Sequence, residues 1–278
     1  MKALLVATFS LALSFGAAVG LNFQKLSMRK EEQRGTKRPV YLQPLWCMGF
    51  IIQAFDACGD FVFIGLAPQS LLAPLGALSL GFNVILAPVF HPSEKATPSL
   101  VLATAFIYVG TIVTILFAPD TNPTYTLEKL LTFVKTALFI LYALACVCFQ
   151  CILLWHGRNY GYGIVHCCAL AGCFGGECIL FAKSTSELVK NAIVGQSYDT
   201  WTTSFIPYIF ILGMILTAIT NVNFLNQGLA RFDALLVVPI YQSFWNAFGI
   251  TGGLIFFQEY RFMSTNDSLM YALGIAIT

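Results

Sequence analysis

Charged residues are scarce in this 278-residue sequence, where Asp, Glu, Lys and Arg together make up 10% of the chain. Soluble domains carry about 25% charged residues, so an ordinary soluble domain is excluded. Hydrophobic residues make up 58% of the chain, and they gather in runs of roughly twenty, the length a helix needs to cross a bilayer. The runs are apolar on every side and lack the alternation of a membrane barrel, so we expect membrane helices.

The motifs of several catalytic classes are also missing. The sequence has no Walker A segment, which excludes an ATP-driven pump, and no HExxH, GxSxG or zinc-ligand spacing. The nine cysteines all fall within apolar runs, where a thiol behaves as a small hydrophobe, so no disulfide framework is expected. We therefore expect no enzyme, no cofactor and no nucleic-acid partner, and the lipid bilayer as the main surrounding.

The apolar runs predict an all-α integral membrane protein with eight full transmembrane helices and a truncated ninth. The expected spans are approximately residues 3–23, 45–65, 70–90, 99–118, 130–155, 161–182, 201–224 and 234–257. A last run begins near Leu269 and reaches Thr278, which is too short to span. We expect a single multi-pass transmembrane domain over residues 1–278, truncated at its C-terminus.

Two segments of the sequence repeat at a constant offset. Leu71-Leu72-Ala73-Pro74 matches Leu236-Val237-Val238-Pro239, and the two copies fall on spans that cross in opposite directions. Six Lys or Arg residues between positions 25 and 38 place that connection on the cytoplasmic side. The pattern predicts two inverted halves, about 1–118 and 130–278, a plan of secondary transporters that places the substrate between the halves. Each proline removes a backbone donor and can open a helix there.

Acidic side chains within the expected spans are the first candidates for a transport pathway. Asp56 and Asp60 lie one turn apart on the second span, with Gln53 on the same face. Two carboxylates so placed repel each other unless a cation lies between them or one is protonated. Glu177 lies in the sixth span beside Gly172 and two further glycines, where another backbone can approach closely. Asp56, Asp60 and Glu177 are therefore the expected metal-attracting groups.

Amide side chains within the spans complete the candidate pathway. Asn83 and Asn246 lie well inside the third and eighth spans, and Asn226 lies at the end of the seventh. An intramembrane amide either joins helices or contacts the substrate. Around Asn226 the polar cluster predicts either a solvated cap or an inner gate, and the residues leave both open.

Other charged residues are expected near water. Lys183, Glu187 and Lys190 are predicted to form a solvated face, and Glu259 is predicted to have a structural role at a helix end. The polar groups left inside the spans are mostly oxygen donors, which hard divalent cations prefer. Acidic groups without a clear intramembrane Arg or Lys favour a cation over an anion.

One segment carries a resemblance to a known family. Residues 67–79, APQSLLAPLGALS, closely resemble the APxSLVxPLGALS signature of the NIPA-type magnesium transporters, within the drug/metabolite transporter superfamily. Pro74, Gly76 and Pro239 are its landmarks, and residues 225–229, LNQGL, resemble the LNxxL before its second repeat. The resemblance implies Mg²⁺ as the transported substrate, in the plasma membrane or an endomembrane. The family's GExxNF segment differs here, since Asp60 stands at its Asn position, so we expect a divergent branch.

Two other functions remain open from the residues. A small-metabolite carrier of the same superfamily would have a large aromatic-lined cavity. A non-transporting scaffold or receptor would give Asp56, Asp60 and Glu177 each a satisfied partner, with no cavity joining them.

Overall fold

The chain is helical throughout the residues that the computed structural model describes, which are 2–35, 38–64, 78–92, 97–117, 125–195 and 199–277. Within these ranges there is no β-strand. The prediction of an all-α protein is therefore confirmed.

Among the described residues, nine long helices overlap the nine predicted apolar runs, although the run predicted at 130–155 is divided between two helices that end at Val134 and begin at Ala137. They are α1 (Lys2–Gln33), α2 (Pro44–Ile64), α4 (Leu78–Phe90), α5 (Pro98–Leu116), α7 (Ala137–Tyr160), α8 (Ile164–Gly195), α10 (Ile206–Arg231), α11 (Ala234–Phe256) and α12 (Thr265–Ile277). Short helical segments lie in the connections: η1 (Val40–Leu42), α6 (Leu127–Val134), α9 (Asp199–Thr203) and η2 (Glu259–Phe262).

Three helices of the described chain are long and apolar enough to cross a membrane, namely α7, residues Ile164–Ile193 of α8, and α10. The count of eight full spans and a partial ninth stays a prediction.

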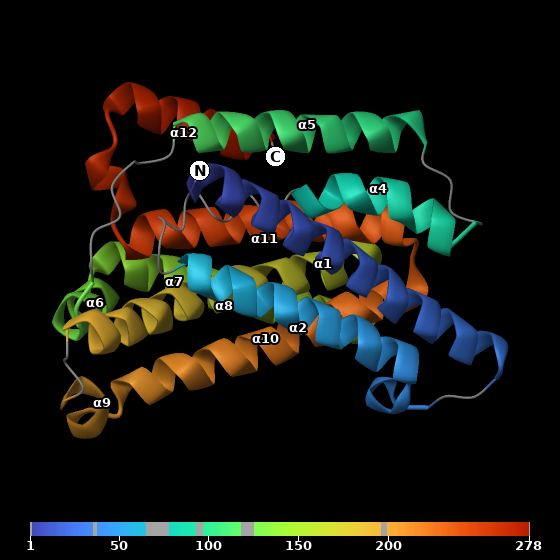
Figure 1. Ribbon diagram of the computed structural model, residues 1–278, viewed down its shortest axis with the longest axis horizontal. Helices are drawn as coiled ribbons and strands as arrows, with labels where there is room; N and C mark the ends of the chain where they lie inside the picture. The colour runs from blue at the N-terminus through green and yellow to red at the C-terminus, as the bar shows by residue number, and fades with distance from the viewer. Residues whose placement is uncertain are drawn as a thin grey trace.

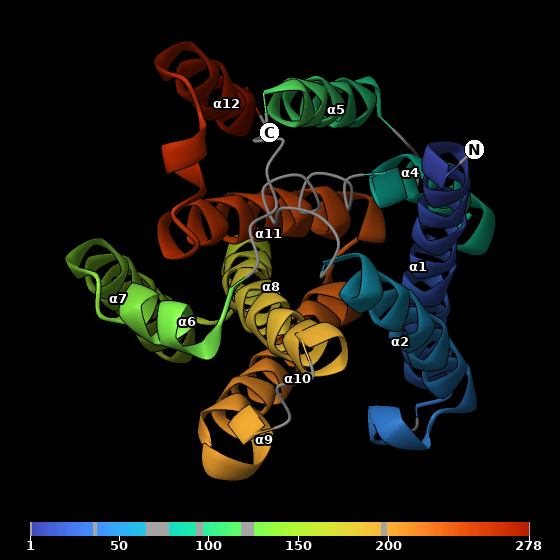
Figure 2. The same cartoon turned by 60° about the vertical axis from the view of Figure 1, so that its left-hand side comes forward.

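The helices run side by side along the long axis of the molecule (Figure 1). In the view of Figure 2, α11, α8 and α10 form a central row, with α1, α2 and α4 grouped on one side and α6 and α7 on the other. Helices α5 and α12 pack together at the edge. Helix α8 packs extensively against both α10 and α11 and also contacts α2 and α7, so it lies at the centre of the bundle.

Glycines let α8 and α11 approach closely. Gly172 and Gly176 are four residues apart and share one face of α8. A Cβ added at Gly176 would lie 2.6 Å from Phe248 Cβ and 2.7 Å from the backbone nitrogen of Gly249. Only a residue without a side chain permits this contact, as expected for small residues between membrane helices. The close approach predicted for the glycines beside Glu177 is therefore confirmed.

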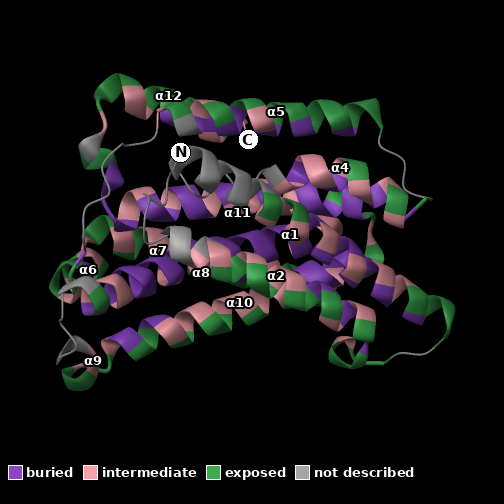
Figure 3. Ribbon diagram, in the orientation of Figure 1, coloured by how far each residue is buried: buried purple, intermediate pink, exposed green. Residues whose placement is uncertain are grey.

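Large apolar side chains lie on the outer faces of the bundle. Leu102 of α5, Leu141 of α7 and Leu216 of α10 are all more than half exposed, and Figure 3 shows the exposed segments along the outer edges of α5 and α10. Extended apolar surface of this kind is covered by lipid or by a partner in a stable protein. The bundle is therefore built to face a bilayer.

Candidate cation site

A pair of buried asparagines joins α1 to α4. Asn22 and Asn83 are both almost fully buried, and Asn22 Nδ2 donates to Asn83 Oδ1 at 3.0 Å and to the carbonyl of Ala18 at 2.8 Å. Within the described chain, no donor lies within hydrogen-bonding distance of Asn22 Oδ1. A buried carbonyl oxygen without a donor is costly, and it is a ready acceptor for water or a ligand for a cation.

The acidic face of α2 is partly described. Asp56 is half-buried, and Gln53, one turn before it, accepts a hydrogen bond of 2.8 Å from Gln24 of α1. Asp60 belongs to α2, but its side chain lies outside the described residues. Pro74 and Gly76 also lie outside the described residues.

Helices α10 and α11 add two more buried amides. Asn246 is fully buried in α11, and its Oδ1 accepts a hydrogen bond of 3.1 Å from Gln242. Its Nδ2 has no acceptor among the described residues. Asn226 of α10 is buried and accepts a bond of 3.2 Å from the indole of Trp46 on α2, so it lies against a neighbouring helix and is not a solvated cap.

Pro239 is buried within α11. The Ser243 hydroxyl donates to its carbonyl at 3.0 Å. Both residues border an apolar groove of about 340 Å³ that is also lined by Phe106 of α5 and Ile277 of α12. The proline therefore lies beside a small apolar space.

Glu177 faces α7. Its Oε1 accepts a hydrogen bond of 2.7 Å from Gln150 Nε2, which also lies 3.2 Å from Cys173 Sγ. The sulfurs of Cys146 and Cys173 and a Glu177 carboxylate oxygen lie within 4.8 Å of one another. The described contacts thus bring Glu177 together with two thiols, and none of them joins it to Asp56.

The expected solvated face on α8 is wrong for Lys183 and Glu187. Both side chains are 0% exposed, and Glu259 of η2 is 1% exposed. Lys183 Nζ lies 3.4 Å from Glu259 Oε1 and 5.1 Å from the centre of the Phe257 ring. The connection after α11 folds back over α8 and excludes water, a tertiary effect that the local pattern could not show. Lys190, farther along α8, is partly exposed.

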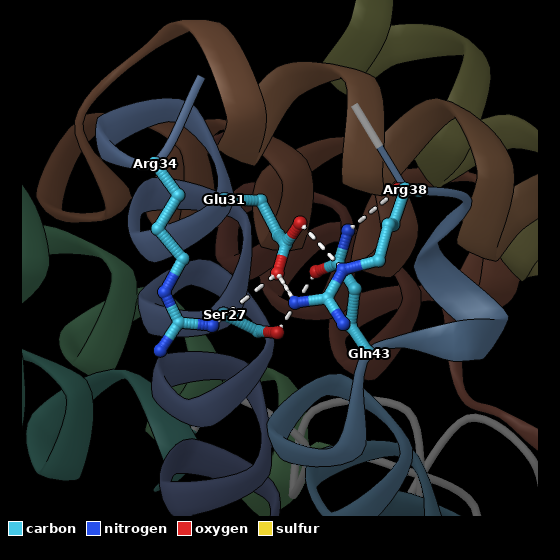
Figure 4. Close-up of polar contacts among 5 residues, drawn as sticks. All are labelled: Ser27, Glu31, Arg34, Arg38 and Gln43. Atoms are coloured by element: carbon cyan, nitrogen blue, oxygen red, sulfur yellow. Dashed lines mark hydrogen bonds and ion pairs between the residues drawn. The ribbon is translucent and has the colours of Figure 1, made fainter. Parts of the chain in front are cut away.

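The basic connection after α1 is held by a polar cluster (Figure 4). Arg38 Nε donates to Glu31 Oε2 at 3.0 Å, and Ser27 donates to Gln43 at 2.8 Å. The hydrogen bond and the charge of the Glu31 carboxylate raise the pKa of Arg38 above its usual value. Gln43 donates in turn to the Arg38 carbonyl at 2.9 Å, so this connection is tied to both flanking helices.

Several polar groups of the site were not predicted. Asn22, Gln150 and Gln242 are amides inside apolar runs, the same signal that identified Asn83, and that signal could have found them. The proximity of Cys146 and Cys173 could not have been found, because it depends on how α7 and α8 face each other.

The fold and the buried polar groups first identify the general class of this protein. A helical bundle with an apolar exterior, buried amides and carboxylates and a buried ion pair is the architecture of a polytopic membrane protein, where intramembrane polar groups mark function. The family model "Magnesium transporter NIPA" matches residues 4–278. This chain belongs to that family.

The sequence identities to individual relatives are low, as expected for a divergent member of the family. The chain is 28% identical over 293 residues to "Probable magnesium transporter NIPA8" of Arabidopsis thaliana, covering 96% of this chain and 64% of the relative. It is 28% identical over 258 residues to "NIPA-like protein 2" of Mus musculus, covering 92% and 66%. It is 24% identical over 281 residues to "Probable magnesium transporter" of Candida albicans, covering 96% and 74%.

The chain therefore spans about two thirds of the length of the first two of these relatives. No solved structure matches it significantly.

Proposed function

We propose that this chain transports Mg²⁺ across a plasma membrane or endomembrane. The observation that carries the proposal is the family match over residues 4–278. The chemistry of the buried groups supports it, because amide and carboxylate oxygens are the ligands that hard divalent cations take. Mg²⁺ keeps several of its waters when bound, so a pathway with few carboxylates and several amides suits a partly hydrated ion.

Asp56 and Asp60 are the groups that attract the cation from α2. The amide oxygens of Asn22 and Asn83 receive it through water, and the buried Asn22 Oδ1 without a protein donor supports that role. Asn246 is a further contact at the centre of α11. These side chains come from four different helices, which lets small helix movements alter the path.

Asn226 and Glu177 are the remaining groups assigned to this pathway. Asn226, held by Trp46, is placed as an inner gate. Glu177 lies near the middle of α8, on the side that faces α7, and contributes negative charge there. We place both within a single transport domain, residues 1–278, built from two inverted halves whose second break is at Pro239.

The alternatives predict different features. A metabolite carrier would need a large aromatic-lined cavity, whereas the groove beside Pro239 measures about 340 Å³ and has one aromatic residue in its lining. A scaffold or receptor would satisfy Glu177 within the protein, and its bond from Gln150 is compatible with that reading. Transport of the ion is the observation that separates these functions.

The test is uptake of Mg²⁺ by cells or proteoliposomes that contain the full-length protein. We expect Asp56→Asn and Asp60→Asn each to lower uptake at least tenfold at matched expression, because each removes a cation-attracting charge. Glu128→Gln is the control, since Glu128 is exposed on α6. Absence of uptake by the unaltered protein would refute the function. Uptake unaffected by both α2 variants would refute the pathway and leave the function standing.

A further inference from the structure

Two helix faces between α7 and α8 carry matched polar pairs. Cys146 and Gln150 are four residues apart on α7, and Cys173 and Glu177 are four residues apart on α8. Residues at this spacing share one face of a helix. Gln150 Nε2 lies 2.7 Å from Glu177 Oε1 and 3.2 Å from Cys173 Sγ, so the two faces meet.

The atoms at this meeting point have the spacing of a metal site. The two sulfurs and a Glu177 oxygen all lie within 4.8 Å of one another. A tetrahedral zinc ion with Zn–S bonds of about 2.3 Å requires its sulfurs to be about 3.8 Å apart. Closing the cluster around an ion therefore needs movements of about 1 Å or less, within the reach of side-chain rotation.

We propose that Cys146, Cys173 and Glu177 form a binding site for a soft or borderline divalent transition-metal ion, of the zinc or cadmium kind. Thiolates select such ions, whereas Mg²⁺ takes oxygen ligands. On binding, each thiol releases its proton to solvent and forms a metal–sulfur bond, so one divalent ion replaces two protons. The fourth position is left to water.

Gln150 is a positioning residue for this site. Its amide hydrogens hold the Glu177 oxygen and the Cys173 sulfur on one side, which fixes both ligands of α8 before an ion arrives. Cys146, Cys173 and Gln150 are all buried, so water competes weakly for the ion. A shell of hydrogen bonds around metal ligands is a general feature of such sites.

The site would fasten α7 to the bundle. In the apolar 18-residue stretch of each helix, 11% of the residues of α7 are buried, against 56% of those of α8. Few protein contacts therefore hold α7 in place. An ion bonded to Cys146 on one helix and to Cys173 and Glu177 on the other would add a link across that boundary. This inference does not depend on Mg²⁺ transport.

The experiment is a Cd²⁺ titration of the reduced full-length protein in detergent, with excess Mg²⁺ present, followed by thiolate-to-cadmium absorption. We expect one saturable ion that Zn²⁺ displaces and Mg²⁺ does not. Cys146→Ser and Cys173→Ser should each weaken binding at least tenfold. Cys148→Ser and Cys151→Ser are the matched controls, because both thiols are exposed on α7.

A second measurement guards against misfolded variants. Because Cys146 and Cys173 are buried, they react with a small apolar alkylating reagent only when α7 moves away from α8. In the unaltered protein, Cd²⁺ should slow this alkylation further and leave the rate at Cys148 and Cys151 unchanged. The proposal is overturned if Cys146→Ser and Cys173→Ser bind Cd²⁺ like the unaltered protein. It is equally overturned if Cd²⁺ protects the control thiols as strongly as the two ligand thiols.

Discussion

The buried ion pair between α8 and η2 yields the sharpest stability prediction. Lys183 and Glu259 are at most 1% exposed, their charged atoms are 3.4 Å apart, and the buried Glu187 lies one turn farther along α8. Lys183→Met leaves the two carboxylates without their buried cation. Removing one partner of a buried pair typically costs about 3–5 kcal/mol, so we expect the folded-to-unfolded ratio to fall by roughly 150- to several-thousand-fold, since about 1.4 kcal/mol is tenfold.

The pair can be separated from its surroundings with a double-mutant cycle. Glu259→Gln should also be destabilising, but less than Lys183→Met, because the buried Glu187 remains as a carboxylate for the ammonium group of Lys183. The double variant should cost less than the sum of the single changes, since the attraction between Lys183 and Glu259 is then lost only once.

The assay is unfolding of the purified protein in detergent by heat or graded denaturing detergent. Lys129→Met, on the exposed surface of α6, is the control and should change stability by at most about 0.5 kcal/mol. Single variants that each cost less than about 1 kcal/mol, or losses that simply add, would contradict the reasoning that this pair is coupled within a dry environment.

Three further changes test other contacts. Gly176→Val should cost several kcal/mol in the same unfolding assay, because its new Cβ would overlap Phe248 on α11; equal stability would refute the close helix contact. Burial raises the pKa of Tyr125 above its usual value, so the phenol stays protonated when folded, and stability should fall as pH rises above about 10. Tyr125→Phe should flatten that alkaline loss, and an unchanged pH profile would contradict this. Asn22→Ala should lower Mg²⁺ uptake more than Asn83→Ala, because it removes the amide oxygen without a donor; the reverse order in uptake assays would exclude that role.

Helix positions were predictable because lipid-facing helices have few ways to satisfy their backbones. The predicted run over residues 234–257 coincides with α11 within one residue at its end. Helix α8 continues past residue 182 to Gly195. The predicted span ended at residue 182 because the charged side chain of Lys183 indicated contact with water. The buried Glu259 partner is what allows the helix to continue without solvent.

The candidate site was predictable one residue at a time but not as an arrangement. Asn83 was identified from its depth in an apolar run, and its burial agrees with that reasoning. Its partner Asn22 lies 61 residues away, a separation at which sequence spacing carries no information on contact. The same limit applies to Glu177, whose nearest polar neighbours come from α7 and not from the acidic face of α2.

The arrangement around α8 separates two kinds of metal chemistry. Several of the oxygen donors proposed for Mg²⁺ lie on α1, α2 and α4, whereas Cys146 lies on α7 and Cys173 on α8. Figure 2 shows α1, α2 and α4 on one side of the central row and α7 on the other. A soft ion is therefore drawn to the thiols and away from the oxygen-lined side, while Mg²⁺ gains little from sulfur. Because α8 carries Glu177 and packs against α10, α11 and α2, an ion that fixes α7 to α8 acts on a helix that also contacts the helix of the proposed acidic groups.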